Sequence, residues 1–284
     1  MTYGKRITWL EDRKKRSVRN FSPNKDIVLF DMDGTLTEPR KPFDKVLTDS
    51  LRELSQVSDI GIVSGSDYDY IAQQLEFLLF NSEMRYKIHL LPCNGTKYYK
   101  PPNNPDENHK LVYSVNMKDE LGEDKFKQLM VGLIQFLGSI DLYKFPLTGH
   151  FIQYRESIVN WSPIGRNAKD KERAAFIEYD NSISPSYRKT LIDLLKRNLT
   201  VRGVKVDIKL GGDTSLDIYP PGWDKTYCLK HFKTKKCWFV GDRCDSDGND
   251  KELYELLKQE GRAFKTESPA NTKLIISEDI LKHF

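Results

Sequence analysis

Cysteine, long apolar runs and an excess of charge of one sign are all scarce or missing in this chain of 284 residues. Its four cysteines have no C-x-x-C spacing and are too few for a disulfide framework, which favours reduced thiols in the cytosol. No apolar run approaches the ~20 residues that a membrane-spanning helix needs. The net charge is only +4, so no general positive field favours nucleic acid. We therefore expect a cytoplasmic protein that binds neither a membrane nor a nucleic acid.

Basic residues do gather in one place, the first 25 residues. This stretch holds lysines and arginines at eight positions against only Glu11 and Asp12. An interaction arm or a sorting address would account for it, but such a run is more often a solvated, partly ordered extension. We interpret residues 1–25 as a basic N-terminal extension.

The strongest chemical signal is the string DMDGT at residues 31–35, which directly follows four apolar residues. Residues two apart on a strand point the same way, so Asp31 and Asp33 would project together from the carboxyl end of a buried strand. Open α/β sheets place their ligands at this end. Two carboxylates this close repel each other unless a cation lies between them or one holds a proton. Mg²⁺ prefers such oxygen ligands, whereas the alternative is a strand that merely ends in an acidic turn.

Alternating strand and helix signals surround this string and then stop. An apolar strand at 59–63 ends in Ser64, Gly65 and Ser66, whose small side chains and free N–H groups suit phosphate oxygens. The alternation stops near residue 100 and resumes with an apolar strand at 238–242. The intervening patterns predict strands at 111–115, 204–208 and 215–219, helices at 124–140, 168–179 and 184–198, and a hairpin over 151–161 that turns near Glu156.

These patterns predict an α/β fold in which an inserted α+β domain interrupts a core with a parallel sheet. The core would comprise residues 26–98 and 220–284, and the insert, which we call the cap, residues 99–219. The cap would contain an antiparallel sheet with helices. This is the layout of a capped hydrolase-like enzyme.

Two further parts of the core carry charged residues at element ends. Lys225 precedes a helical stretch at 226–232, where it could neutralise a phosphoryl group and a nucleophilic carboxylate, although most lysines are simply solvated. Asp242 follows an apolar strand in a loop rich in Asp and Asn, as a Mg²⁺ site requires. The metal ligands would be Asp31, the Asp33 carbonyl, Asp242 and Asp250 of the same loop. A calcium loop starting at Asp245 is the alternative, but it lacks the required Gly and Glu.

The cap carries a group of arginines near hydroxyl, amide and carboxylate side chains. Arg155, Arg166 and Arg173 could grip phosphate with their planar guanidinium groups. Ser215 and Asp217 could accept or donate to sugar hydroxyls. Chemistry alone leaves open whether this group binds a phosphorylated sugar or forms a salt-bridged surface.

The motifs resemble those of known families. The DMDGT string after an apolar strand resembles the first motif of the haloacid dehalogenase (HAD) superfamily, whose members form an aspartyl-phosphate on the first Asp. The string R-x-x-x-x-N-x-S-P-I-G-R at 155–166, followed by S-L-D and P-x-G-W-D-K, resembles the eukaryotic-type phosphomannomutases, and the similarity extends from Asp26 to the C-terminal end. This resemblance implies a HAD-like Rossmannoid core, interconversion of mannose 6-phosphate and mannose 1-phosphate for GDP-mannose synthesis, Mg²⁺, a hexose 1,6-bisphosphate activator and a homodimer formed through the cap.

The resemblance also implies roles for individual residues. Asp31 would be the nucleophile, Asp33 the general acid and base, and Lys225 the third catalytic residue. The substrate-binding residues would be Arg40, Ser64, Ser66, Arg155, Asn160, Arg166, Arg173, Ser215 and Asp217.

Some residues depart from the family pattern. Ser64 and the pair Glu156-Ser157 stand where the family usually has Gly and Asn-Gly, and Asp245 and Asp247 make the metal loop more acidic. One alternative is therefore a HAD-type sugar-phosphate phosphatase that uses water as the acceptor. Another is a non-catalytic binding protein that uses the basic extension, although the complete set of motif residues argues against lost catalysis. The sequence leaves the preferred hexose open.

Overall fold

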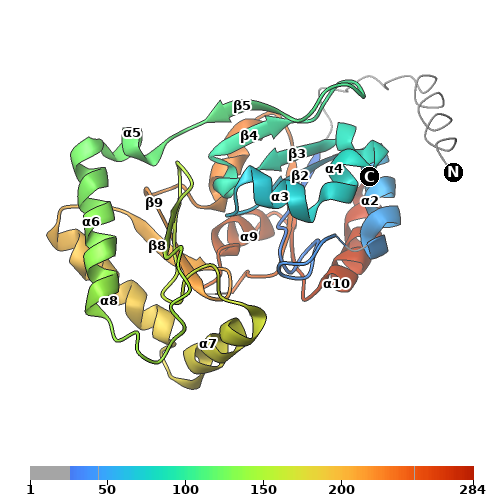
Figure 1. Cartoon of the computed structure of the whole chain (residues 1–284). Helices are drawn as coiled ribbons and strands as arrows, with labels where there is room; N and C mark the ends of the chain where they lie inside the picture. The colour runs from blue at the N-terminus through green and yellow to red at the C-terminus, as the bar shows by residue number, and fades with distance from the viewer. Residues whose placement is uncertain (1–25, 44, 246) are drawn as a thin grey trace, which may run out of the picture.

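The computed structural model describes residues 26–43, 45–245 and 247–284, so the basic extension predicted over 1–25 lies outside the described residues. Two sheets organise this part of the chain (Figure 1). A seven-stranded sheet has the order β11-β10-β1-β2-β3-β4-β5, and a four-stranded sheet has the order β6-β7-β9-β8. The predicted α/β class with a separate antiparallel sheet is confirmed.

The larger sheet is centred on β1 (Ile27–Phe30), which pairs in parallel with β2 (Asp59–Val63) and β10 (Cys237–Gly241). Parallel strands β3 (Ile88–Leu91) and β11 (Ala263–Lys265) extend it on either side. Every residue of β1, β2, β3 and β10 is buried. Continuous apolar strands of this kind are typical of parallel sheets that are covered on both faces.

Alternate residues of β1 enter two different hydrophobic clusters. Val28 and Phe30 pack with the helices between β1 and β3 and with the C-terminal helices, whereas Ile27 and Leu29 pack with the segments that flank β10. The helices of the core are α2 (Thr48–Val57), α3 (Tyr68–Gln74), α4 (Glu76–Phe80), α9 (Lys251–Lys258) and α10 (Pro269–Leu274). The other helical segments, which are 3₁₀ or π rather than α, are η1 (Lys45–Leu47), η2 (Glu83–Tyr86), η3 (Cys93–Gly95), η4 (Lys225–Phe232), η5 (Ile275–Ile280) and η6 (Leu281–His283).

The core sheet continues further along the chain than the predicted boundary at residue 99. That boundary falls within β4 (Lys97–Lys100), and β5 (Lys110–Ser114) pairs antiparallel with β4 at the edge of the seven-stranded sheet. The β-α alternation stops near residue 100 because a hairpin follows β3, so a loss of alternation does not mark the end of the sheet.

The smaller sheet contains β6 (Ile152–Tyr154), β7 (Val159–Trp161), β9 (Ser215–Tyr219) and β8 (Asp207–Gly211), all antiparallel. Its helices are α5 (Met117–Leu121), α6 (Glu123–Ser139), α7 (Asp170–Ser182) and α8 (Tyr187–Val201). Apolar residues of α6 and α8 bury Val159, Trp161 and Leu216 on one face of the sheet. Because strand residues alternate, Asn160, Ser215 and Asp217 share the opposite face. The α+β character predicted for the insert and its hairpin near Glu156 are confirmed.

One strand of the cap lies later than expected. The apolar alternation predicts a strand over 204–208, but β8 spans Asp207–Gly211. Val204 is buried in the turn that ends α8, where its N–H donates to the carbonyl of Leu199 (2.9 Å). A buried apolar residue in the turn after a helix can therefore be mistaken in the sequence for the first residue of a strand.

None of the helices in the described part of the chain combines the length and the apolar character that crossing a bilayer requires.

Candidate active site

Asp31 lies at the carboxyl end of β1, beside a buried lysine. Its N–H donates to the carbonyl of Val240 (2.9 Å), which fixes the start of the loop, and its Oδ1 accepts from the Lys225 ammonium. Lys225, only 1% exposed, also donates to Asp250 Oδ1. Burial would lower the pKa of Lys225, but Asp250 and Asp31 outweigh it and raise that pKa. Lys225 is therefore a fixed cation between two carboxylates.

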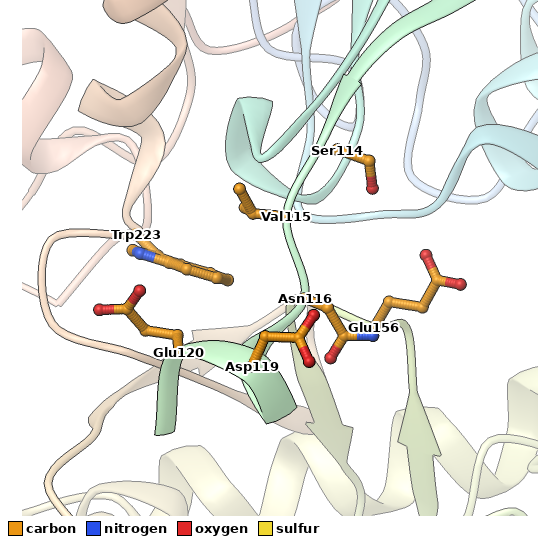
Figure 2. A pocket seen from close by; sticks show the side chains of 7 residues that line it. All are labelled: Ser114, Val115, Asn116, Asp119, Glu120, Glu156 and Trp223. Carbon is orange, nitrogen blue, oxygen red and sulfur yellow. The ribbon is translucent and has the colours of Figure 1, made fainter. Parts of the chain in front are cut away.

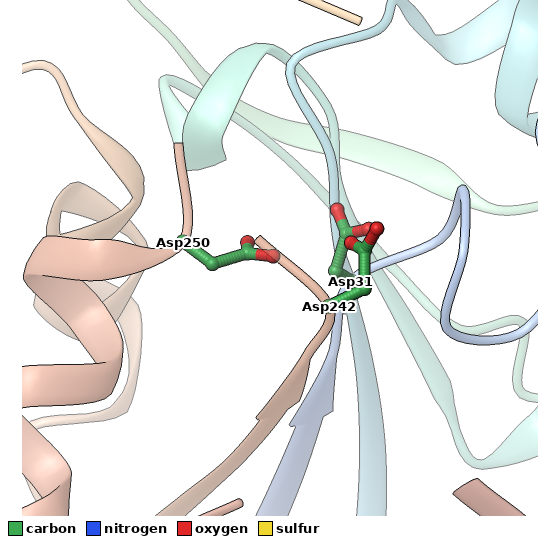
Figure 3. A group of neighbouring side chains, drawn as sticks. All are labelled: Asp31, Asp242 and Asp250. Carbon is green, nitrogen blue, oxygen red and sulfur yellow. The ribbon is translucent and has the colours of Figure 1, made fainter. Parts of the chain in front are cut away.

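Three carboxylates converge at this point (Figure 3). Ligand oxygens of Asp31, Asp242 and Asp250 all lie within 4.8 Å of one another, with Asp250 pointing from the start of α9 toward the ends of β1 and β10. Asp242 Oδ1 is buried and has no hydrogen-bond partner among the described residues. Burial, reinforced by the charge of Asp250, raises the pKa of Asp242 to about 6. The cluster thus carries more negative charge than Lys225 alone can offset.

Gly34 allows these carboxylates to come together. It has a left-handed backbone with φ 91°, and a Cβ there would lie 2.3 Å from Asp242 Oδ2. Any other residue would push Asp242 away from the first motif. The glycine of the DMDGT string is thus required both for the turn and for the close approach.

Asp33 faces the cavity rather than this cluster. Its Oδ1 accepts from the main-chain N–H of Arg40 (3.0 Å) and from the Tyr70 hydroxyl (3.1 Å). Burial raises the pKa of Asp33, which favours a carboxyl group that can carry a proton. No sequence pattern points to Tyr70, because its contact with Asp33 depends on how α3 packs beside β1.

A cavity of about 390 Å³ separates the core loops from the cap sheet. Asp31 and Asp33 line it from the core side. All nine residues predicted to bind substrate line it as well: Arg40, Ser64, Ser66, Arg155, Asn160, Arg166, Arg173, Ser215 and Asp217. Residues more than one hundred positions apart in the chain therefore surround a single space.

The cap wall of this cavity is a hydrogen-bonded network. Asn160 accepts from Arg166 (2.7 Å) and donates to Asp217 (2.7 Å) and Ser215 (2.9 Å). Burial, together with the charge of Arg155, lowers the pKa of Arg166 to about 10. A bound phosphate would offset that repulsion between guanidinium groups, so this wall is suited to an anion.

Direct contacts between residues that line the cavity join the cap to the core. Arg155 donates to the carbonyl of Gly65 (2.8 Å), so the tip of the cap hairpin contacts the loop that follows β2. Arg243 donates to the carbonyl of Gly212 (2.7 Å) and pairs with Asp213. Arg243 was not predicted as a site residue, although its position directly after Asp242 could have suggested it.

A second cavity, of about 500 Å³, lies where β5 leads into α5 (Figure 2). The carboxylates of Asp119, Glu120 and Glu156 and the ring of Trp223 line it. None of the predicted site residues lies there. Three carboxylates would repel a phosphate group, so the chemistry suited to phosphorylated ligands belongs to the first cavity.

Comparison with known proteins agrees with this geometry. The family model described as "Eukaryotic phosphomannomutase" matches residues 47–283. The chain belongs to the eukaryotic phosphomannomutase family. It is 34% identical to phosphomannomutase 1 of Dictyostelium discoideum, over 89% of this chain and 95% of that protein. It is 36% identical to the phosphomannomutase of Arabidopsis thaliana, over 84% and 90% respectively.

A solved structure of another enzyme has a similar fold. The chain is similar to a truncated, IMP-bound IMP-nucleotidase of Plasmodium falciparum, with a TM-score of 0.60 and 17% identity. The match covers 92% of this chain and 69% of the nucleotidase. At this identity the likeness supports the HAD-like fold alone. Family membership favours the mutase over the phosphatase alternative.

Proposed function

We propose that this protein interconverts mannose 6-phosphate and mannose 1-phosphate in the cytoplasm, through phosphorylated Asp31 and a hexose 1,6-bisphosphate, and so supplies GDP-mannose synthesis. One observation carries the proposal. A nucleophile with a carboxyl partner, Asp31 and Asp33, faces the cap arginines Arg166 and Arg173 across one cavity. That arrangement allows one phosphate of a bisphosphate to react while the other is held.

The reaction follows from the positions of these groups. Asp31 attacks the phosphoryl group of the bisphosphate, and Asp33 gives a proton to the departing sugar oxygen. Lys225 offsets charge beside the nucleophile. The sugar phosphate then presents its other end, Asp33 takes the proton of that hydroxyl, and the phosphoryl group returns to the sugar. The contacts of Arg155 and Arg243 keep the cap over the cavity, which limits the access of water to phospho-Asp31.

The acidic cluster fits Mg²⁺. Asp31, Asp242 and Asp250 would hold the ion, and the unpartnered Asp242 oxygen supplies a ready ligand. The bound ion would neutralise charge on the transferring phosphoryl group. The Asp33 carboxylate is not part of this cluster, so any contribution of Asp33 to the metal would come from its main-chain carbonyl.

A coupled assay of mannose 1-phosphate conversion tests the proposal. Turnover should depend on Mg²⁺ and rise when a hexose 1,6-bisphosphate is added, because the bisphosphate phosphorylates Asp31. Inorganic phosphate should remain a minor product. Release of phosphate without isomerisation would instead establish the phosphatase alternative.

The raised pKa of Asp242 predicts how metal-free protein responds to pH. When folding raises the pKa of a carboxyl, the protonated carboxyl stabilises the folded protein. This stabilisation is complete below the unfolded pKa of 3.8, and it is lost as the pH rises toward the folded pKa of about 6. The loss should be on the order of 2–3 kcal/mol. Because Mg²⁺ binds the ionised carboxylates, it should raise the melting temperature more at about pH 7 than at about pH 4.5. Thermal unfolding in EDTA and in Mg²⁺ measures this, and an equal Mg²⁺ effect at both pH values would contradict it.

We propose further that the protein forms a homodimer through the cap. Val131 and Ile134 of α6 are 44% and 59% exposed, and their spacing of three residues puts them on the same side of the helix. Ile134→Lys should shift the protein toward monomer in sedimentation velocity. The control is Leu274→Lys, which places the same charge at an exposed apolar residue of the core. A dimer that is insensitive to Ile134→Lys would rule out this side of the helix.

A further inference from the structure

We propose that Tyr70 is a positioning residue for Asp33: its hydroxyl fixes one carboxyl oxygen, so that the other oxygen exchanges the proton with the sugar. This inference rests on the proposed function and extends it to a residue outside the predicted motifs. Tyr70 lines the same cavity as Asp31 and Asp33.

The contacts of Asp33 are unevenly divided between its two oxygens. Both donors, the Arg40 N–H at 3.0 Å and the Tyr70 hydroxyl at 3.1 Å, bond to Oδ1. Within the described ranges, no hydrogen bond joins Oδ2 to another residue. Two donors on one oxygen orient the carboxyl plane and leave the second oxygen available to a ligand in the cavity.

The structure also fixes Tyr70 itself. It lies in the first turn of α3, where its N–H donates to the capping side chain of Asp67 (3.1 Å). Asp67 in turn lies 4.0 Å from the guanidinium of Arg155 in the cap. A capped helix start is a rigid support, so the hydroxyl is held at a defined distance from Asp33.

This arrangement places the proton that is exchanged with the sugar on Asp33 Oδ2 in both half-reactions. As Asp31 forms its bond to phosphorus, the bond between phosphorus and the sugar oxygen breaks. The sugar oxygen keeps the electron pair of that bond and takes the proton from Asp33 Oδ2. In the second half, the attacking hydroxyl returns a proton to Oδ2 while its oxygen bonds to phosphorus and the acyl-phosphate bond breaks. A freely rotating Asp33 would meet the sugar oxygen in a productive geometry less often.

Tyr70→Phe removes only the hydroxyl and tests the inference. With saturating hexose 1,6-bisphosphate, kcat for mannose 1-phosphate should fall about tenfold or more, as expected for a lost hydrogen bond to a charged group. KM should change less than twofold, because Tyr70 acts on Asp33 and not on the phosphate-binding arginines. The matched control is Tyr68→Phe on the same helix, whose ring stacks on Tyr99 and lies outside the cavity lining. That variant should keep both parameters.

The possible results separate the two proposals. A wild-type enzyme without mutase activity would refute the proposed function itself. An active wild-type enzyme with an unchanged Tyr70→Phe kcat would refute the role of Tyr70 alone. A fall in kcat accompanied by an equal rise in KM, or by a lower melting temperature than that of Tyr68→Phe, would assign Tyr70 to substrate binding or to folding and would also overturn the inference.

Discussion

Asp31→Asn is expected to lose turnover of mannose 1-phosphate by several orders of magnitude, because it removes the proposed nucleophile. An amide cannot form the acyl-phosphate on which both half-reactions depend. Stability should not fall, because burial raises the pKa of Asp31 and the folded protein therefore holds its charged form at a cost. Lys225 also keeps its second partner, Asp250.

Three measurements on one preparation test this expectation. The coupled assay gives turnover, thermal unfolding gives stability, and calorimetric titration with mannose 1-phosphate shows whether the cap arginines still bind. Asp49→Asn makes the same chemical change on an exposed side chain of α2 and should leave all three unaltered. Asp31 would cease to be the nucleophile if the variant retained a substantial part of the wild-type rate.

Lys225→Met is expected to have the largest effect on stability. Lys225 is buried between Asp31 and Asp250, and Asp242 lies in the same cluster. Removing the cation leaves these carboxylates without compensation, and loss of one partner of a buried ion pair costs about 3–5 kcal/mol. Activity should also be lost, since Asp31, the proposed nucleophile, would no longer be held beside a positive charge.

Chemical denaturation at neutral pH measures this effect. Mg²⁺ should recover part of the lost unfolding free energy, because a divalent cation supplies positive charge to the same carboxylates. Lys127→Met provides the control, because its ion pair with Glu123 is exposed and such pairs contribute little to stability. If the two variants unfold at the same denaturant concentration, Lys225 does not neutralise the cluster.

Several features of the site could be predicted from short strings. Asp31 and Asp33 could be placed at a strand end because four apolar residues precede them and a Gly-Thr turn follows. Asp242 could be placed in the same way after an apolar strand. The carboxyl ends of parallel strands meet at one edge of a sheet, so local patterns were enough to predict that Asp31 and Asp242 lie close together.

Other features depend on contacts between distant segments. The end of the core sheet was placed too early because an antiparallel hairpin, β4–β5, has no βα signature. The support of Asp33 by Tyr70 was also missed. Tyr70 is separated from Asp33 by 37 positions, and its neighbours in the sequence show only an ordinary helix start.

Short local patterns were enough to narrow the possible chemistry, because Asp31 and Asp33 follow one buried strand, Lys225 begins a helical stretch and Asp242 follows another strand. Only the packing of the elements shows which oxygen of Asp33 accepts the hydrogen bonds and how Arg155 and Arg243 join the cap to the core. The two kinds of feature differ in the range over which they act. Backbone pattern and chain direction act over a few residues, whereas hydrogen bonds between side chains from different elements exist only once those elements have packed.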